Sequence, residues 1–476
     1  MPAPRRLPLL AAATAFATAL AGQPMTLREV VDRAVAQSLI VDGAEQRLSA
    51  SRVELRRSEL ARYPSLAFQS GGGFQFGLNV DPTTNLLEQQ TIGFTNFSLD
   101  AGATLYAGGR LRNAVKRDRA GLAAAEAELA AARQDIALQT TQLYLEALLA
   151  TEAVGNAENL RDQAASRLRT ITGRVGAGQA APADQLQPEA ELARQEQAVV
   201  SARNARELAR LNLEQLLRLP PGERLELSAP ETLGLDAVAL ADVTPAELYA
   251  AAAERQPDLR AARLGEEAAR YDVEVAKAGY RPTVSAFGQA NTRYSSQAIR
   301  RAADDGPPVI ESQTVIINGQ EVELGFPQPN IRLEDIPLTD QLSDFFGQAV
   351  GLNLRVPIFS QGLNDASRGL AEARAEQARI DRERAELELR TATEQALAGA
   401  RNARAEVAAA RRALDAAERA YAAAQRRTEL GAGTGFDITD QRLLLEQAQI
   451  TLLRARYQYV FNAKVVDFYL GRPLEL

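Results

Sequence analysis

The side chains that most often carry protein chemistry are missing from this chain of 476 residues, which contains no His and no Cys. Zinc, haem and iron–sulfur sites therefore lose their usual ligands, and Ser–His–Asp and Cys–His catalysis are impossible. We find no converging acid, base and nucleophile, so we expect neither an enzyme nor a cofactor. The formal charge of −7 argues against a nucleic-acid partner, which would require a concentrated basic surface.

The remaining candidates are three aspartates that follow glycine-containing turns. Asp184 ends the segment RVGAGQAAPAD, and Asp437 and Asp440 belong to ELGAGTGFDITD. A carboxylate at the start of a helix accepts hydrogen bonds from free backbone N–H groups and complements the helix dipole. Asp184 and Asp437 occupy such positions, and Asp440 lies one turn later, where capping-box acids occur. The local sequence therefore favours a helix cap for Asp184 and leaves the role of Asp437 open. A cap would not exclude a second role, for which Asp440 is the strongest candidate.

The segments that would position these aspartates occur twice along the chain. A helical segment ending at Pro64 recurs 218 residues later, ending at Pro282. The glycine turns recur at a larger offset, because Gly178 corresponds to Gly431, 253 residues later. Each copy follows the order helix, strand, loop, strand, very long helix, tight turn, helix. An internal repeat of this kind predicts two copies of one structural unit.

The sequence predicts the following division of the chain. Residues 1–21 contain two arginines, an Ala-rich apolar run and a small-x-small site, which predicts a cleaved signal peptide. The first repeat then covers 22–227 and the second 228–476. The second repeat carries the extra residues in a longer loop at 295–345, which we expect to be external, with a small hairpin at its Asn-Gly pair.

Four segments alternate apolar and polar residues with a period of two. They lie near 65–77, 93–106, 283–294 and 350–358, and the third alternates poorly. A membrane barrel strand has this period because one side faces lipid and the other a wet lumen, but a half-buried soluble sheet has it too. Four strands cannot close a membrane barrel, whereas three chains would supply twelve.

Two proline-free segments are long enough to be the walls of a tunnel. Between 111 and 175, apolar residues recur every seven positions, as in helices packed side by side in a coiled coil. The segment 364–430 keeps the length with a weaker stripe. A helix of about 65–70 residues is roughly 100 Å long, too long for a globular core. Helices of about half this length are expected at 26–62 and 184–218.

With these features in this order, the chain resembles the TolC-type outer-membrane efflux family over about residues 22–476. The resemblance rests on the tandem repeat, the helix-to-strand prolines Pro64 and Pro282, the strand endings LYAGG and IFSQG, and the two glycine turns. It implies a mainly α protein with a membrane β-barrel portion. In the implied homotrimer, a twelve-stranded outer-membrane β-barrel is continuous with a long periplasmic α-helical barrel.

The resemblance also implies a function and partners. The chain would be the outer-membrane exit duct of a tripartite efflux or type I secretion system, a passive channel for small molecules or proteins. It would contact outer-membrane lipid, a periplasmic adaptor (membrane fusion) protein and an inner-membrane RND, ABC or MFS transporter.

Roles for individual residues follow from the resemblance as well. Asp437, Asp440 and Asp184 match the aspartates that constrict the channel as a periplasmic gate, where like carboxylates favour cations. Gly178 and Gly431 match the tip glycines that adaptors contact, although a helix C-terminal turn alone would also require glycine there. The basic residue that precedes the aspartate pair in the best-known members is missing, because GTGF stands directly before Asp437. The latch of the closed tip must therefore differ or be weaker.

Two other classes of protein remain open. A periplasmic coiled-coil adaptor or structural scaffold would also contain long helices. An adaptor, however, would have one hairpin per chain and a lipoyl-like β-module, whereas this chain has two hairpins with strand pairs between its helices. An enzyme is the third class, and no set of catalytic residues supports it.

Overall fold

The computed structural model describes residues 24–80, 87–89, 91–229, 243–317, 319–430, 432 and 435–474. The expected signal peptide at 1–21 and the tip residue Gly431 lie outside these residues. The chain divides into two compact units, each of which draws on both sequence repeats. The predicted boundary between the repeats, at 227/228, therefore does not separate the two compact units, and it remains a prediction.

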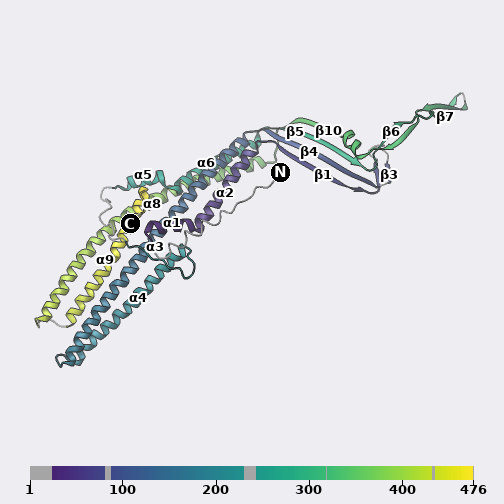
Figure 1. Cartoon of the computed structure of the whole chain (residues 1–476). Coiled ribbons are helices and arrows are strands. Elements are labelled where there is room, and N and C mark those ends of the chain that lie inside the picture. Colours follow the sequence, from purple (N-terminus) through teal and green to yellow (C-terminus); the bar gives the residue numbers. More distant parts are fainter. Residues whose placement is uncertain are drawn as a thin grey trace. The chain divides into compact units, whose positions relative to one another are not determined.

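The first unit comprises Met1–Val53, Asp118–Ala269 and Arg374–Leu476, and it is helical. Its elements, some of which continue into the second unit, are α1 (Leu27–Gln37), α2 (Leu39–Leu60), α3 (Arg110–Gly176), the 3-10 turn η1 (Pro182–Gln185), α4 (Leu186–Leu216), α5 (Pro245–Arg255), α6 (Pro257–Lys277), α8 (Leu363–Glu429) and α9 (Gly435–Leu470) (Figure 1). Within the unit, α3 runs beside α4 and α8 beside α9, so each long helix forms a hairpin with its successor (Figure 1).

The two long helices have the lengths that the sequence predicts. Both α3 and α8 contain 67 residues, within one residue of the expected ends of each. The seven-residue stripe of α3 faces protein, since its buried members include Val115, Leu129, Ile136, Ala157 and Ala164. Periodic apolar side chains therefore hold α3 against its neighbours.

The expected single helix at 26–62 is wrong, because the chain breaks it into α1 and α2 at Ser38. Ser38 is extended, and its Oγ accepts a hydrogen bond from the Ile40 N–H at 3.2 Å, which caps α2. The second repeat breaks 218 residues later at Gln256, directly before Pro257. Proline disfavours helix at the residue before it and suits the first helical position.

The largest apolar cluster of the first unit joins the short helices to α3. Tyr144 and Ile136 of α3 are almost fully buried against Val30 of α1 and Leu213 and Leu217 at the end of α4. The Tyr144 hydroxyl lies 3.1 Å from the Met25 carbonyl oxygen and 2.6 Å from that of Ser228. The Tyr144 side chain therefore holds the N-terminal segment and the segment after α4 together.

The second unit comprises Glu54–Arg117 and Arg270–Ala373 and contains the sheet. Four antiparallel strands, β1 (Ser65–Gln75), β4 (Ile92–Ala107), β5 (Thr283–Ser295) and β10 (Gly347–Arg355), lie in the order β1-β4-β5-β10 (Figure 1). The expected extension of the fourth strand to 358 is wrong. The strand ends at Arg355, two residues before Pro357, which has no N–H to donate to a ladder.

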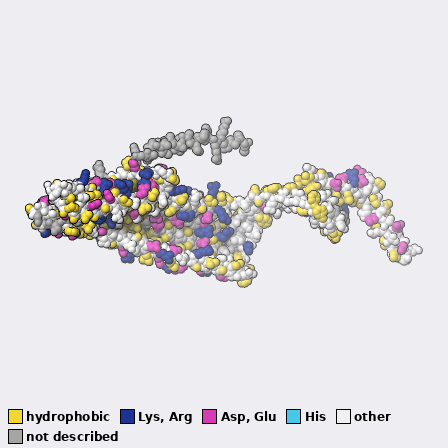
Figure 2. Space-filling view, turned by 90° about the horizontal axis from the view of Figure 1, so that it is seen from below, with side chains coloured by type: hydrophobic (Ala, Val, Ile, Leu, Met, Phe, Trp, Pro, Cys, Tyr) yellow, Lys and Arg dark blue, Asp and Glu magenta, His cyan; other side chains and the backbone are white. Residues whose placement is uncertain are grey.

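The sheet has one apolar and one polar face. In the observed register Leu66, Ala101, Gly288 and Val350 form one row across all four strands, and Phe68, Leu99 and Ala290 belong to a neighbouring row on the same face. The opposite face carries mainly short polar side chains, among them Gln69, Ser98, Asp100, Gln289, Asn291 and Asn353. Few charged side chains cover the four strands, whereas charged side chains are dense over the helices (Figure 2).

Smaller strand pairs lie beyond the ends of the sheet strands. They are β2 (Leu78–Val80) with β3 (Leu87–Gln89), β6 (Ile299–Ala303) with β9 (Ile331–Asp335), and β7 (Val309–Ile317) with β8 (Gln320–Gln328), while α7 (Leu338–Asp344) and the 3-10 turn η2 (Ala278–Tyr280) flank β10 and β5. The hairpin expected near 318–319 is confirmed, because Ile317 pairs with Gln320 and Gly319 has a φ of 80°.

Candidate functional site

The tips of the two helical hairpins close with matching backbone turns. In the first tip, the Gln179 N–H donates to the Arg174 carbonyl at 2.8 Å, and Gly178 has a φ of 72°. In the second tip, the Ala432 N–H donates to the Arg427 carbonyl, also at 2.8 Å and 253 residues further along. Gly178 is exposed, and a Cβ added to it would meet no atom within 4 Å apart from its chain neighbours.

The three aspartates singled out from the sequence all lie at these tips and are exposed. Asp184 belongs to η1, and its Oδ2 accepts a hydrogen bond from the Ala181 N–H at 3.0 Å. It therefore acts as a local cap. Asp437 lies in the first turn of α9, where a carboxylate complements the helix dipole, and Asp440 lies one turn later.

A cavity of about 700 Å³ lies at the tips and is lined by residues of both hairpins. Asp184 and Arg174 of the first hairpin line it together with Phe436 and Arg442 of the second. Asp437 and Asp440 are not among the described residues that line it. The two hairpins are also joined here by the Gln187 side chain, whose Nε2 donates to Thr439 Oγ1 at 3.0 Å.

A buried network of charges connects α4 to α9 a few residues from the tips. The Arg442 Nη2 lies 3.3 Å from Glu191 Oε1, and its Nε lies 3.4 Å from Glu446 Oε1 without the geometry of a hydrogen bond. Gln195 Nε2 donates to Glu191 at 2.7 Å and to Glu446 at 3.0 Å. Arg194 binds the same two carboxylates, and its hydrogen bonds to Glu191 raise the pKa of its guanidinium.

The sequence analysis missed this network, and the reason is physical. Glu191, Gln195, Arg442 and Glu446 are each less than a tenth exposed. On their own helices they form ordinary i,i+3 and i,i+4 pairs, which are most often solvated. The sequence did contain a signal for this network. Charged residues on the inward face of a packed helix need partners on another element.

The other two tip helices are joined by an aromatic contact. Arg167 of α3 donates from Nη2 to the Tyr421 hydroxyl of α8 at 2.6 Å, and its guanidinium lies 5.9 Å from the ring centroid. Repeat-related helices therefore contact each other in pairs, α3 with α8 and α4 with α9. Both contacts lie within one protomer.

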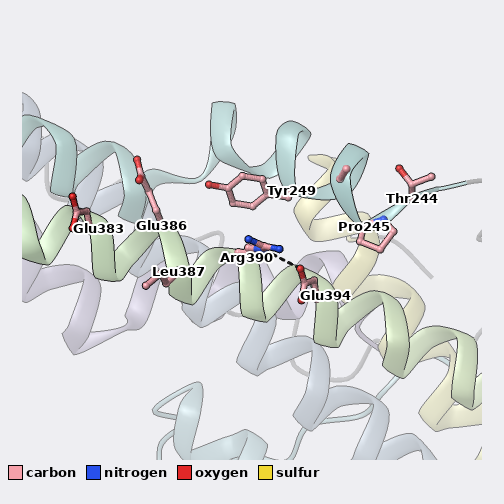
Figure 3. A pocket seen from close by; sticks show the side chains of 9 residues that line it. Thr244, Pro245, Tyr249, Glu383, Glu386, Leu387, Arg390 and Glu394 are labelled. Atoms are coloured by element: carbon pink, nitrogen blue, oxygen red, sulfur yellow. Dashed lines mark hydrogen bonds and ion pairs between the residues drawn. The ribbon is translucent and has the colours of Figure 1, made fainter.

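A second cavity of about 690 Å³ lies between α5 and α8. Figure 3 shows Tyr249 of α5 over Arg390 of α8, with Glu383 and Glu386 one to two turns away along α8. The charges on its wall are satisfied locally: Arg390 binds Glu394 at 3.0 Å, Glu383 binds Arg379 at 2.5 Å, and Glu386 binds Arg382 at 2.8 Å. No charge is left for a ligand among these described side chains.

The described residues contain no group of three acidic side chains placed to hold a metal ion. Of the helices described, none is both long and apolar enough to cross a membrane. Pro64 and Pro282 stand directly before β1 and β5, where the chain changes from helix to strand.

The apolar face of the sheet is uncovered. Side chains on it that are largely exposed include Leu66, Phe68, Phe74, Val350, Leu352 and Leu354, and Val350 reaches 88%. The outer strands β1 and β10 each have one neighbour in the sheet, so each presents one edge of unpaired backbone groups. A continuous apolar surface of this kind marks a contact with lipid or with another protein.

Comparison with known proteins agrees with these features. The chain is 28% identical to Protein CyaE of Bordetella pertussis over 263 residues, which span 55% of this chain and 53% of CyaE, about half the length of that relative. The solved structure of CusC superposes with a TM-score of 0.75 at 17% identity, covering 94% of this chain and 92% of that one.

Two other outer membrane proteins are similar in fold. VceC, an outer membrane protein of Vibrio cholerae, has a TM-score of 0.71 at 18% identity, covering 94% of this chain and 97% of VceC. The open-state MtrE outer membrane channel of Neisseria gonorrhoeae has a TM-score of 0.71 at 19% identity, covering 94% and 90%. The sequence profile described as "Outer membrane efflux protein" matches residues 30–217 and 339–472, and the chain therefore belongs to the outer membrane efflux protein family.

Proposed function

We propose that three copies of this chain form an outer-membrane exit duct, a passive channel that works with an inner-membrane pump through a periplasmic adaptor. The observation that carries the proposal is the four-stranded sheet, with one exposed apolar face and an unpaired edge on β1 and on β10. In lipid every backbone N–H and C=O must be paired, so these edges must bind further strands. Edge-to-edge pairing of three sheets gives twelve strands, enough to close a barrel.

The two faces of the sheet suit such a barrel. The face with Leu66, Phe68 and Val350 would contact outer-membrane lipid, and the face with Gln69, Asp100 and Asn353 would line a wet lumen. The helical hairpins would extend into the periplasm. Family membership favours this duct over the alternative of a periplasmic adaptor or structural scaffold.

The hairpin tips would carry the gate and the adaptor contact. In a trimer Asp437 and Asp440 would place six carboxylates around the periplasmic opening, with Asp184 close by, so that cations are favoured over anions. The cap formed by Asp184 is compatible with this role, because its carboxylate remains exposed. Gly178 and Gly431 would contact an adaptor that leads to an RND, ABC or MFS transporter. The α4–α9 network would hold the hairpins together without the family's basic latch residue.

The experiment that tests the duct combines location with assembly. We expect the full-length chain to fractionate with outer membranes, to require detergent for release and to have the mass of a trimer by native mass spectrometry. In planar bilayers the purified protein should conduct ions. A monomer in detergent, or recovery in the soluble periplasm, would contradict the proposal.

A further inference from the structure

The residues between β5 and β10 form two successive two-stranded ribbons that the proposed duct does not use. The first ribbon pairs β6 with β9, and the second pairs β7 with β8. This region holds the extra residues of the second repeat. An isolated two-stranded ribbon is at best marginally stable in water, so these ribbons need a second layer.

The ribbon of β6 and β9 has two different faces. One face carries Arg300 and Glu334, whose charged groups lie 3.8 Å apart, and Arg332, which is also paired with Glu334. The opposite face is mostly apolar, with Ile331 and Leu333 of β9 46% and 59% exposed. The charges on the first face are therefore satisfied, while the apolar face is uncovered.

The apolar face of this ribbon also carries one cation and one anion. Arg301 lies opposite Leu333, and Asp335 lies opposite Ile299, on the same side of the ribbon. Within the part of the chain that the structure describes, neither side chain has an ion-pair partner. The face is thus mostly apolar, with Arg301 in its middle row and Asp335 in an end row, and each of these charges can meet its complement on an identical face.

The ribbon of β7 and β8 has the same asymmetry in weaker form. The register puts Val315 opposite Val322, and the next rows on the same face pair Leu324 with Gln313 and Phe326 with Glu311. Leu324 and Phe326 are 38% and 46% exposed. The central rows of the other face pair Ser312 with Gly325 and Thr314 with Glu323, and apolar residues occur there only towards its ends.

A second copy of the chain is the occupant that these observations favour. The ribbons begin and end on β5 and β10, and β10 is an outer strand of the sheet. In the proposed trimer, on which this inference rests, β10 pairs with a neighbouring chain, so the ribbon arises beside the interface between copies. Arg301 and Asp335 make the face self-complementary in charge. In a cyclic assembly the cation of one copy can meet the anion of the next.

We propose that the mostly apolar faces of the ribbons bind one another across the three copies and form a collar beyond the barrel. Each ribbon provides the second layer that its neighbours lack. The Arg301 of each copy pairs with Asp335 of the adjacent copy within this contact. The collar is therefore an interaction surface of the chain with itself, separate from the pairing of β1 with β10.

Single cysteines test this collar, because the chain has no native Cys and each new thiol can be linked only to another copy. We expect the full-length trimer with Val315→Cys to give dimers on denaturing gels after treatment with a bismaleimide. The matched control is Thr314→Cys, one residue away on the opposite face, which should give several-fold fewer dimers. Reversing one charge in the Val315→Cys background, Arg301→Glu, should reduce linking, and adding Asp335→Arg should restore it.

Native mass spectrometry of the same variants separates this inference from the proposed duct. A trimer in which Val315→Cys and Thr314→Cys link equally, or not at all, overturns the collar and leaves the duct intact. The collar is also overturned by a trimer in which Val315→Cys gives no linked dimers and reacts with a water-soluble maleimide in detergent but not in liposomes. In that case lipid covers the face. Loss of the trimer itself contradicts the duct.

Discussion

Arg442 Nη2 of α9 lies 3.3 Å from Glu191 Oε1 of α4, and this buried ion pair joins the two helical hairpins of one protomer. The guanidinium is surrounded by Glu191 and Glu446, each less than a tenth exposed. Without it the two carboxylates would repel each other in a poorly solvated position. Breaking a buried charge pair by removing one partner is far more costly than losing an exposed one.

We therefore expect Arg442→Met to loosen the tip. Arg194 still reaches both carboxylates, so we expect the free energy of unfolding to fall by about 1–3 kcal/mol, less than for a fully isolated buried pair. Thermal unfolding measures the loss, and bilayer recordings should show a larger closed-state conductance. Arg419→Met, which removes an exposed pair with Asp415, is the control and should cost less than about 1 kcal/mol. Equal stability of the two variants would show that the network contributes nothing.

The gate hypothesis predicts the effect of removing tip charge. Changing Asp437 and Asp440 together to Asn removes six carboxylates per proposed trimer and hardly alters side-chain shape. We expect cation-over-anion selectivity to fall several-fold and block by trivalent cations to weaken, because the local negative potential is lost. Asp32→Asn removes an exposed carboxylate of α1 and should leave selectivity unchanged. If planar-bilayer recordings of the double variant match the wild type, the aspartates serve only as helix caps.

Acid should remove the benefit of the two capping boxes. The Thr26 backbone N–H donates to Glu29 at 2.8 Å and lowers the pKa of that carboxyl, and Thr244 lowers the pKa of Glu247 in the same way. A lowered folded-state pKa stabilises the protein above the unfolded value of 4.5, and this stabilisation is lost as pH falls through the folded value.

The double change Glu29→Gln and Glu247→Gln should therefore lower the Tm at pH 7, and its difference from wild type should shrink as pH falls below the range of carboxyl ionisation. Thermal scans across pH measure this. The control Glu54→Gln alters an exposed glutamate and should show no such trend. A constant Tm difference at every pH would reject the electrostatic part of the cap.

Tyr144 should anchor the N-terminal segment. Its buried hydroxyl lies within hydrogen-bond distance of the carbonyl oxygens of Met25 and Ser228. Burial raises the pKa of this hydroxyl to about 12. Tyr144→Phe removes the hydroxyl donor from the Ser228 carbonyl, whereas the Met25 carbonyl keeps the Ser228 N–H at 2.9 Å, so we expect a cost of about 1–3 kcal/mol. Hydrogen exchange at the Met25 and Ser228 amides should accelerate. Tyr63→Phe, at an exposed tyrosine, should change neither stability nor exchange, and protection of both amides in Tyr144→Phe would contradict the assignment.

Local pattern determined much of the architecture. The apolar period of seven predicts α3 to within one residue at each end, and the period of two places three of the four sheet strands, whereas β5 alternates poorly. Both periods follow from backbone geometry within a few residues. The duplication is equally visible in the sequence, and the structure adds to it a break in the short helix that recurs 218 residues later. That break itself was missed at Ser38, where a single capping hydroxyl interrupts otherwise continuous helical periodicity.

Only the tertiary structure decided which repeated elements meet. Strands β4 and β5 come from different repeats and pair at the centre of the sheet, and Glu191 meets Arg442 although 251 positions separate them. Local propensity carries no information about such pairs, because a charged side chain on a single helix is solvated unless another element packs over it. The sequence by itself determined the two long helices with their lengths and the approximate positions of the strands that form the sheet. Packing determined which of their faces are buried and which, such as the face with Val350, remain open for a partner.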